Sequence, residues 1–168
     1  KKLLLKLKDY NHKQFLFTAV RTEKDLDKNE ISNDTSFKFH FANILKKYHR
    51  FFYFLKIKKT YKYLTREFNC QEIDICHAHT LFSDGGVALR LWEDYKLPYI
   101  IAVRNTDVNT FLKYLKHLHP YGKSILKNAS GVIFMNEDYK HHVLQYFKDR
   151  ELKKNILEKS FVIPNGVD

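Results

Sequence analysis

The residues best suited to chemistry are two histidines, His77 and His79, which stand one residue apart at the end of an apolar run. If that run is a strand, its two-residue period puts both imidazoles on one face. Imidazole nitrogens are common zinc ligands. The two histidines therefore allow the hypothesis of a metal site.

Polar residues also follow other apolar runs in the chain. They are Ser83, Asp84, Gly85 and Gly86 after the run 73–78; Arg104, Asn105 and Asp107 after 99–103; Asn136 and Glu137 after 132–135; and Asn165 after 161–163. Such groups gather at one edge when the runs are parallel strands of one sheet, and ligands of such sheets bind outside the carboxyl ends of the strands. That edge is the predicted site.

Two of these groups have a simpler interpretation as well. Gly85 and Gly86 lie in the first turn of a predicted helix, where free backbone amides could face a ligand, or where small residues could serve tight packing. Asn136 followed by Glu137 is typical of a helix cap with an acid placed favourably in the helix dipole. Neither pattern matches a nucleotide-binding glycine loop.

The elements that must position these residues alternate between strands and helices. Short apolar runs predict strands at 15–20, 37–41, 73–78, 99–103, 132–135 and 161–163, and helical spacing predicts helices at 43–66, 83–95, 108–127 (interrupted near 120–122) and 137–147. Residues 21–36 are polar and aperiodic and predict a loop. We expect an α/β fold, with a Rossmann-like parallel sheet and helices on both faces.

Composition narrows the classes of protein. The chain has 168 residues, about one domain, and 44% of them are hydrophobic, which excludes global disorder. No apolar run approaches the ~18–20 residues of a membrane-spanning helix. Cys70 and Cys76 form neither a disulfide framework nor a zinc pattern and fit a reducing compartment.

The net charge of +11 points to anionic partners and is concentrated in residues 43–66, which hold eight lysines and arginines and no acid. The segment reads as one amphipathic helix with a basic face. It is either a core-packed helix with solvated lysines or a surface that docks on an anionic membrane, and no recognition motif suggests nucleic acid. The predicted membrane-facing residues are Lys46, Lys47, Arg50, Lys58, Lys59 and Lys62.

The string His77-Ala-His79-Thr80-Leu81-Phe82-Ser83-Asp84-Gly85 resembles the first metal-binding motif of the PHP phosphoesterases, HxHTxxSDG. That resemblance implies a metal-dependent phosphoesterase using His77, His79 and Asp84. The later histidines of the chain stand in helical or turn contexts, so we expect no metal site and keep this function as an alternative.

A second resemblance covers residues 73–168. The strand ending in His77-Ala78-His79, the pair Gly85-Gly86, the string Val103-Arg104-Asn105-Thr106-Asp107, the segment Asn128-Ala129-Ser130-Gly131-Val132 and the closing Pro164-Asn165-Gly166-Val167-Asp168 occur in the order seen in glycosyltransferase family 4. The chain looks like the N-terminal, acceptor-side half of a GT-B enzyme, similar to transferases of bacterial surface and capsular polysaccharides. Many relatives carry a histidine where Arg104 stands here.

The resemblance implies one Rossmann-like domain over 1–168, without the family's first strand and glycine-rich loop and without the C-terminal donor domain. It implies a retaining transfer from a UDP- or GDP-linked sugar to a saccharide or lipid-linked acceptor, by a cytoplasmic protein at the inner face of the membrane, with no cofactor bound by this half. The fragment alone is expected to be inactive. The expected acceptor-binding residues are His79, Ser83, Asp84, Gly85, Gly86, Arg104, Asn105, Asp107, Asn136, Glu137 and Asn165. A non-enzymatic module that binds membrane or nucleic acid is the other alternative.

Overall fold

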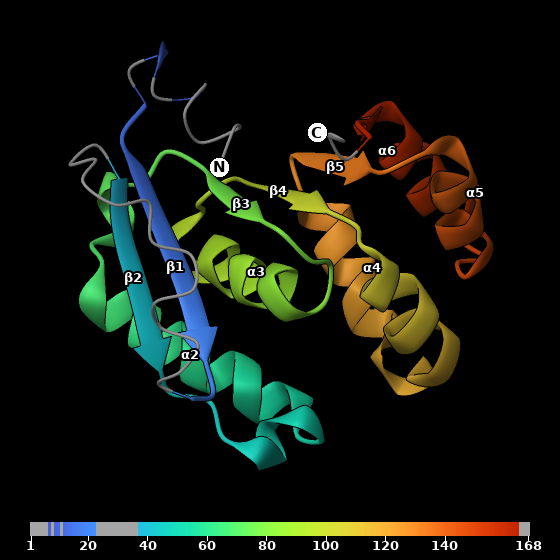
Figure 1. The fold of residues 1–168 in the computed structure, drawn as a ribbon. Helices are drawn as coiled ribbons and strands as arrows, with labels where there is room; N and C mark the ends of the chain where they lie inside the picture. Colours follow the sequence, from blue (N-terminus) through green and yellow to red (C-terminus); the bar gives the residue numbers. More distant parts are fainter. Residues whose placement is uncertain (1–6, 8, 11, 23–36, 165–168) are drawn as a thin grey trace. The chain divides into compact units, whose positions relative to one another are not determined.

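The computed structural model describes residues 7, 9, 10, 12–22 and 37–164 (Figure 1). The chain forms two compact units, residues 1–64 and 65–168, and each is described by itself. The predicted loop 21–36 lies almost wholly outside the described residues, as does Asn165. The expectation of one domain over the whole chain stays a prediction.

The first unit contains two parallel strands, β1 (Gln14–Val20) and β2 (Phe37–Asn43), paired in register from Gln14 with Phe37 to Val20 with Asn43. Helix α2 (Tyr53–Glu67) begins in this unit. Tyr63 connects it to the sheet, because its hydroxyl lies 3.0 Å from His40 Nε2 and its ring contacts Phe17. Both strands that the sequence predicted here are confirmed.

The single helix predicted over 43–66 is wrong, because the segment is divided into three parts. Asn43 ends β2, a 3-10 turn labelled η2 covers Lys47–Arg50, and α2 begins only at Tyr53. The turn is closed by the backbone N–H of Lys46, which donates to Nδ1 of the buried His49 at 2.8 Å. Lys46, Lys47 and Arg50 therefore precede α2, whereas Lys58, Lys59 and Lys62 lie on it.

The second unit contains a four-stranded parallel sheet in the order β3-β4-β5-β6. Its strands are β3 (Cys76–Ala78), β4 (Tyr99–Ala102), β5 (Gly131–Phe134) and β6 (Ser160–Val162), and Ala78, Ile101, Val132 and Ser160 stand side by side across it. The four predicted strands are confirmed, with β3 shorter than the apolar run suggested. The fold is α/β and Rossmann-like, as the sequence predicted.

The helices of this unit are α3 (Ser83–Tyr95), α4 (His119–Asn128), α5 (Glu137–Gln145) and α6 (Arg150–Glu158), with short turns η3 (Cys70–Glu72), η4 (Asp107–Leu112) and η5 (Lys116–Leu118). Helix α3 agrees with the prediction. The predicted helix 108–127 is divided into η4, η5 and α4, and Pro120 stands in the first turn of α4, where its missing N–H costs no hydrogen bond. Helix α6 was not predicted from the sequence.

Helices α3 and α4 pack on one face of this sheet and run side by side in Figure 1. The hydroxyl of the fully buried Tyr99 donates to the carbonyl of Ile125 at 2.8 Å and so joins β4 to α4. Gly85 of α3 lies against Ile101 and Ile125. This packing fixes the carboxyl ends of the strands, where the polar groups stand. No helix in the described part of the chain is long and apolar enough to span a bilayer.

Candidate functional site at the carboxyl ends of the strands

The carboxylate of Asp107 joins the two loops that follow β3 and β4. Its Oδ2 accepts the backbone N–H groups of Leu81 and Arg104, each at 2.9 Å, and its Oδ1 accepts that of Phe82 at 3.1 Å. Leu81 and Phe82 are fully buried beside it. The loop carrying His79 is therefore tied to the loop carrying Arg104 by one side chain.

Asp107 itself is enclosed, with only 1% of its surface exposed. Burial raises the pKa of its carboxyl group, and the three backbone N–H donors act in the opposite direction by stabilising the charged form. The structure shows Asp107 holding the two loops, and the contact with the acceptor that the sequence predicted for it stays a prediction.

Asp107 also begins η4, a π-helical turn over Asp107–Leu112 where the sequence suggested an ordinary helix. Single π-turns are rare and frequently accompany functional sites.

Arg104 lies across the end of β3. Its Nε donates to the carbonyl oxygen of His79 at 3.3 Å, and its side chain is half-buried. His79 is exposed at the same edge. The structure therefore brings together the two residues that the sequence singled out on neighbouring strands, a guanidinium and an imidazole.

The rings of His77 and His79 stack with their centroids 4.4 Å apart. Burial, followed by the neighbouring His79 and Arg104, lowers the pKa of His77 to about 4. Although part of His79 is exposed, desolvation by the surrounding protein lowers the pKa of its imidazole; Asp84 opposes this shift and Arg104 adds to it. Both imidazoles are therefore neutral at pH 7, while the guanidinium of Arg104 carries the positive charge.

The backbone amides of Gly85 and Gly86 do not face a ligand, so the predicted access to them is wrong. The N–H of Gly85 donates to Thr80 O at 2.9 Å and that of Gly86 to Phe82 O at 3.0 Å, and both residues are buried. A Cβ on Gly85 would lie 3.0 Å from Ile125 Cγ2 and 3.2 Å from Thr80 O. The alternative interpretation, tight packing of helix on sheet, is confirmed for Gly85.

At the start of α3, Thr80 takes the part of a cap. Its Oγ1 accepts the backbone N–H of Asp84 at 3.0 Å. The Asp84 side chain is exposed and Ser83 is half-buried, so both stand at the edge near His79.

The group after β5 is connected to the same edge through Tyr139, a residue that the sequence analysis missed. Its hydroxyl donates to Asn105 Oδ1 at 2.7 Å, and Asn109 Nδ2 donates to the same oxygen. Asn136 caps α5 by accepting the backbone N–H of Tyr139 at 2.7 Å. The cap interpretation of Asn136 is confirmed. One feature of the sequence could have identified Tyr139: it stands three residues after the cap Asn136, in the first turn of the helix that follows β5.

Glu137 is exposed and pairs with Lys140 at 2.6 Å along α5. Hydrogen bonds thus link the residues after β3, β4 and β5. The predicted residues of this edge that are exposed or half-buried are His79, Ser83, Asp84, Arg104, Asn105, Asn136 and Glu137.

Metal chemistry finds little support here. Among the described residues, no group of three or more histidine, cysteine, aspartate or glutamate side chains is arranged to hold a metal ion. His77 and His79 stack on each other, and His77 Nε2 is buried without a hydrogen-bond partner. His77, His79 and Asp84, the three residues of the phosphoesterase alternative, do not form such a group.

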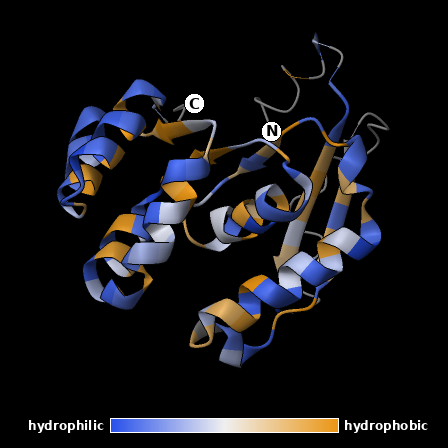
Figure 2. Ribbon diagram, turned by 180° about the vertical axis from the view of Figure 1, so that it is seen from behind, coloured by the Kyte–Doolittle hydropathy of each residue, from blue (hydrophilic) through white to orange (hydrophobic). Residues whose placement is uncertain are grey.

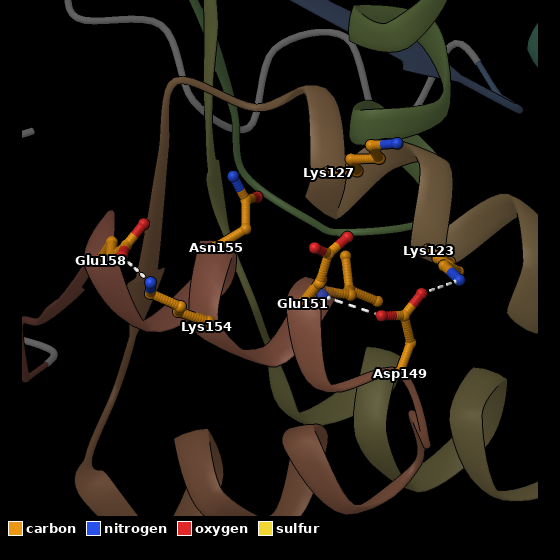
Figure 3. A pocket seen from close by; sticks show the side chains of 8 residues that line it. Lys123, Lys127, Asp149, Glu151, Lys154, Asn155 and Glu158 are labelled. Atoms are coloured by element: carbon orange, nitrogen blue, oxygen red, sulfur yellow. Dashed lines mark hydrogen bonds and ion pairs between the residues drawn. The ribbon is translucent and has the colours of Figure 1, made fainter.

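The structure also contains an open depression of about 350 Å³ between α4 and α6 (Figure 3). Three lysines and three acids line it with Leu152 and Asn155: Lys123, Lys127, Lys154, Asp149, Glu151 and Glu158. Lys123 pairs with Asp149, and Lys154 pairs with Glu158 at 3.8 Å. None of the residues that line it belongs to the candidate site. Its balanced charges offer no preference for an anion or a cation.

Comparison with known proteins agrees with this architecture. Residues 3–168 match the family model described as Glycosyltransferase Family 4. The chain is also 31% identical over 94 residues to TuaC of Bacillus subtilis (strain 168), whose name assigns it as a glycosyltransferase to teichuronic acid biosynthesis. That match covers 56% of this chain and 22% of the relative. With the family match extending over nearly the whole chain, the protein belongs to glycosyltransferase family 4.

Proposed function

We propose that this chain supplies the acceptor-binding wall of a retaining glycosyltransferase that uses a nucleotide-activated sugar and builds a cell-surface polysaccharide. The observation that carries the proposal is the fixed edge formed by Arg104 and His79. Asp107 holds the backbone of both loops, and Arg104 Nε is bonded to the His79 carbonyl. A guanidinium and an imidazole are thus held in place before any ligand arrives.

These side chains suit an acceptor sugar. In the transfer, the bond from the anomeric carbon to the diphosphate oxygen breaks and a bond from that carbon to the acceptor oxygen forms. The nucleoside diphosphate departs and takes up the proton of the acceptor hydroxyl. A neutral imidazole can accept a hydrogen bond from that hydroxyl, whereas an imidazolium cannot. The lowered pKa of His79 keeps this capacity at neutral pH. Asp84 and Glu137 add exposed carboxylates that can accept further hydroxyl protons.

Arg104 further favours an acceptor that carries negative charge. A guanidinium presents its donors in a planar fork that matches a carboxylate or a phosphate. The similarity to a protein of teichuronic acid biosynthesis points in the same direction, toward an acidic polymer. A lipid-linked diphosphate acceptor has the same chemical requirement. The donor sugar, its UDP or GDP carrier and the remaining catalytic groups belong to the proposal only through the family.

Binding of oligosaccharides to this chain tests the proposal. Saturation-transfer NMR would compare a uronic-acid oligosaccharide with its neutral, carboxyl-reduced form, using wild type, Arg104→Ala and Arg90→Ala. Arg90, an exposed arginine on α3 that pairs with Glu93, is the matched control. We expect weak binding that prefers the acidic ligand, a loss of about tenfold in Arg104→Ala, and no change in Arg90→Ala. Equal binding of both ligands, or equal loss in both variants, would contradict the assignment to Arg104.

A further inference from the structure

The first unit carries a group of exposed hydrophobic side chains where η2 gives way to α2. Their exposed fractions are 46% for Tyr48, 83% for Phe51, 57% for Phe52, 55% for Phe54 and 51% for Leu55. We call these five residues the aromatic wedge. Single exposed apolar residues are normal on a protein surface, but five within eight residues mark an interaction site.

The wedge is held by the fold and is not a loose end of chain. The 3-10 turn before it is closed by the bond from Lys46 N to Nδ1 of the buried His49, and the Tyr48 ring lies on the His49 ring with centroids 4.3 Å apart. On its other side, α2 is fixed by the buried Ile57 and by the contact of Tyr63 with His40. The aromatic side chains are therefore presented to solvent in a fixed place.

Lysines surround the wedge and continue its face. Phe54, Lys58 and Lys62 are spaced by four residues, so they share one side of α2, and all three are exposed. Lys46 and Lys47 stand exposed just before the wedge. Figure 2 shows hydrophobic segments gathered at the start of α2 and hydrophilic ones alternating along the rest. No acid occurs between Asn43 and Arg66.

We propose that the aromatic wedge inserts into the interface of an anionic lipid bilayer while Lys46, Lys47, Lys58 and Lys62 contact the lipid headgroups. Aromatic and leucine side chains beside lysines are the pattern of helices that lie in the membrane interface. Aromatic side chains beside lysines could also stack on the bases of single-stranded nucleic acid. Leu55 cannot stack in this way, and no nucleic-acid recognition motif accompanies the segment, so the acyl boundary of a bilayer fits the wedge better. A second copy of the chain is disfavoured because it would bring two basic faces together.

The membrane-facing surface predicted from the sequence relied on basic residues alone, and insertion of the aromatic wedge is the new element. Binding depends on insertion of the wedge as well as on charge, so salt should weaken it without abolishing it. It does not rest on the proposed transferase function, since lipid vesicles without any sugar can test it.

Co-sedimentation with vesicles is the test. We expect the whole chain to bind phosphatidylcholine vesicles that contain phosphatidylglycerol and to bind pure phosphatidylcholine much more weakly. The variant Phe51→Ser/Phe54→Ser should lose about tenfold or more, and Lys58→Gln/Lys62→Gln about thirtyfold, since each lysine near an anionic surface contributes about fivefold. The matched controls are Tyr114→Ser, an exposed aromatic of the second unit, and Lys116→Gln/Lys148→Gln. They should bind as wild type.

Insertion is measured directly with Phe51→Trp in a Trp92→Phe background, because Trp92 is the one tryptophan of the sequence. Brominated lipids should quench the fluorescence of this residue. Circular dichroism establishes that each variant is folded, and the lysine variant keeps the test informative if the serine variant is not. Unchanged vesicle binding in both double variants would overturn the proposal. So would wedge-dependent dimers or oligonucleotide binding in the absence of vesicle binding.

Discussion

Replacing Asp107 should destabilise the second unit more than any exposed carboxylate does, by an amount that follows from its three hydrogen bonds. In Asp107→Ala, the N–H groups of Leu81, Phe82 and Arg104 lose their acceptor. Each buried donor left unsatisfied costs about 1–3 kcal/mol, and the loops can relax toward water. We therefore expect a loss of about 3–5 kcal/mol in the free energy of unfolding.

The isosteric variant Asp107→Asn separates geometry from charge. Its amide oxygen can replace Oδ2 and keep the bonds from Leu81 and Arg104, but the amide NH₂ then faces the N–H of Phe82. Part of this loss is offset because burial already disfavours the charged carboxylate, as the raised pKa of Asp107 indicates. We expect a loss of about 1–3 kcal/mol, smaller than for alanine.

Urea unfolding followed by the fluorescence of Trp92 measures both losses. This tryptophan lies on α3, the helix that follows the loop held by Asp107. Asp94→Ala, an exposed acid near the end of the same helix, is the control and should change stability by less than ~0.5 kcal/mol. Both Asp107 variants should also weaken binding of the acidic oligosaccharide, because the Arg104 loop is released. If Asp107→Ala and Asp107→Asn each left the free energy of unfolding within ~0.5 kcal/mol of the wild-type value, the hydrogen bonds of Asp107 would not stabilise the two loops. The positioning role would then be refuted.

Two further perturbations follow from the same unit. Gly85→Ala should lower the free energy of unfolding by about 1–3 kcal/mol, because the added Cβ would press on Ile125 and on the Thr80 carbonyl. Urea unfolding measures this loss, with Asp84→Ala in the same turn as the control. A neutral or stabilising result for Gly85→Ala would show that this packing is not tight. Stability should fall as pH drops from about 6.5 to 4, because only the unfolded chain then protonates His77, whose pKa is about 4 when folded. After solvent screening we expect the wild type to lose about 1–2 kcal/mol more than His77→Gln over this range, and parallel pH profiles would contradict that cause.

Residues 43–66 show which features a residue pattern can predict and which depend on the folded structure. Helical spacing predicted one helix over 43–66, of which only the part from Tyr53 onward is helix α2. The concentration of basic residues marked the same segment as unusual. The break between Lys46 and Tyr53 was not predictable from spacing, because it depends on burial of His49 and on the bond it accepts from the Lys46 N–H. Only that break exposes Phe51 and Phe52 as a wedge, where a continuous helix would have distributed them around its axis.

Helix α6 and Tyr139 were missed for related reasons. Within α6 only Leu152 and Ile156 are buried. Because most of the residues around them are charged or polar, the sequence shows no clear helical period of apolar residues there. Apart from its place after the cap Asn136, nothing in the sequence distinguishes Tyr139 from the other tyrosines. Its part in the site depends on the hydrogen bond from its hydroxyl to Asn105 Oδ1, which only the structure shows.

The amino-acid sequence was enough to predict the strands, the α/β class, the order of polar groups after the strands and the family. Buried parallel strands require apolar runs, and local caps such as Asn136 use neighbours in the sequence. Which of these polar residues are exposed and which are enclosed depends on the tertiary structure. Asp107 accepts from residues 25 and 26 positions away, and Gly85 is confined by Ile125 of another helix. Burial and hydrogen-bond partners of this kind come from contacts distant in the chain, and no local pattern of residue types contains them.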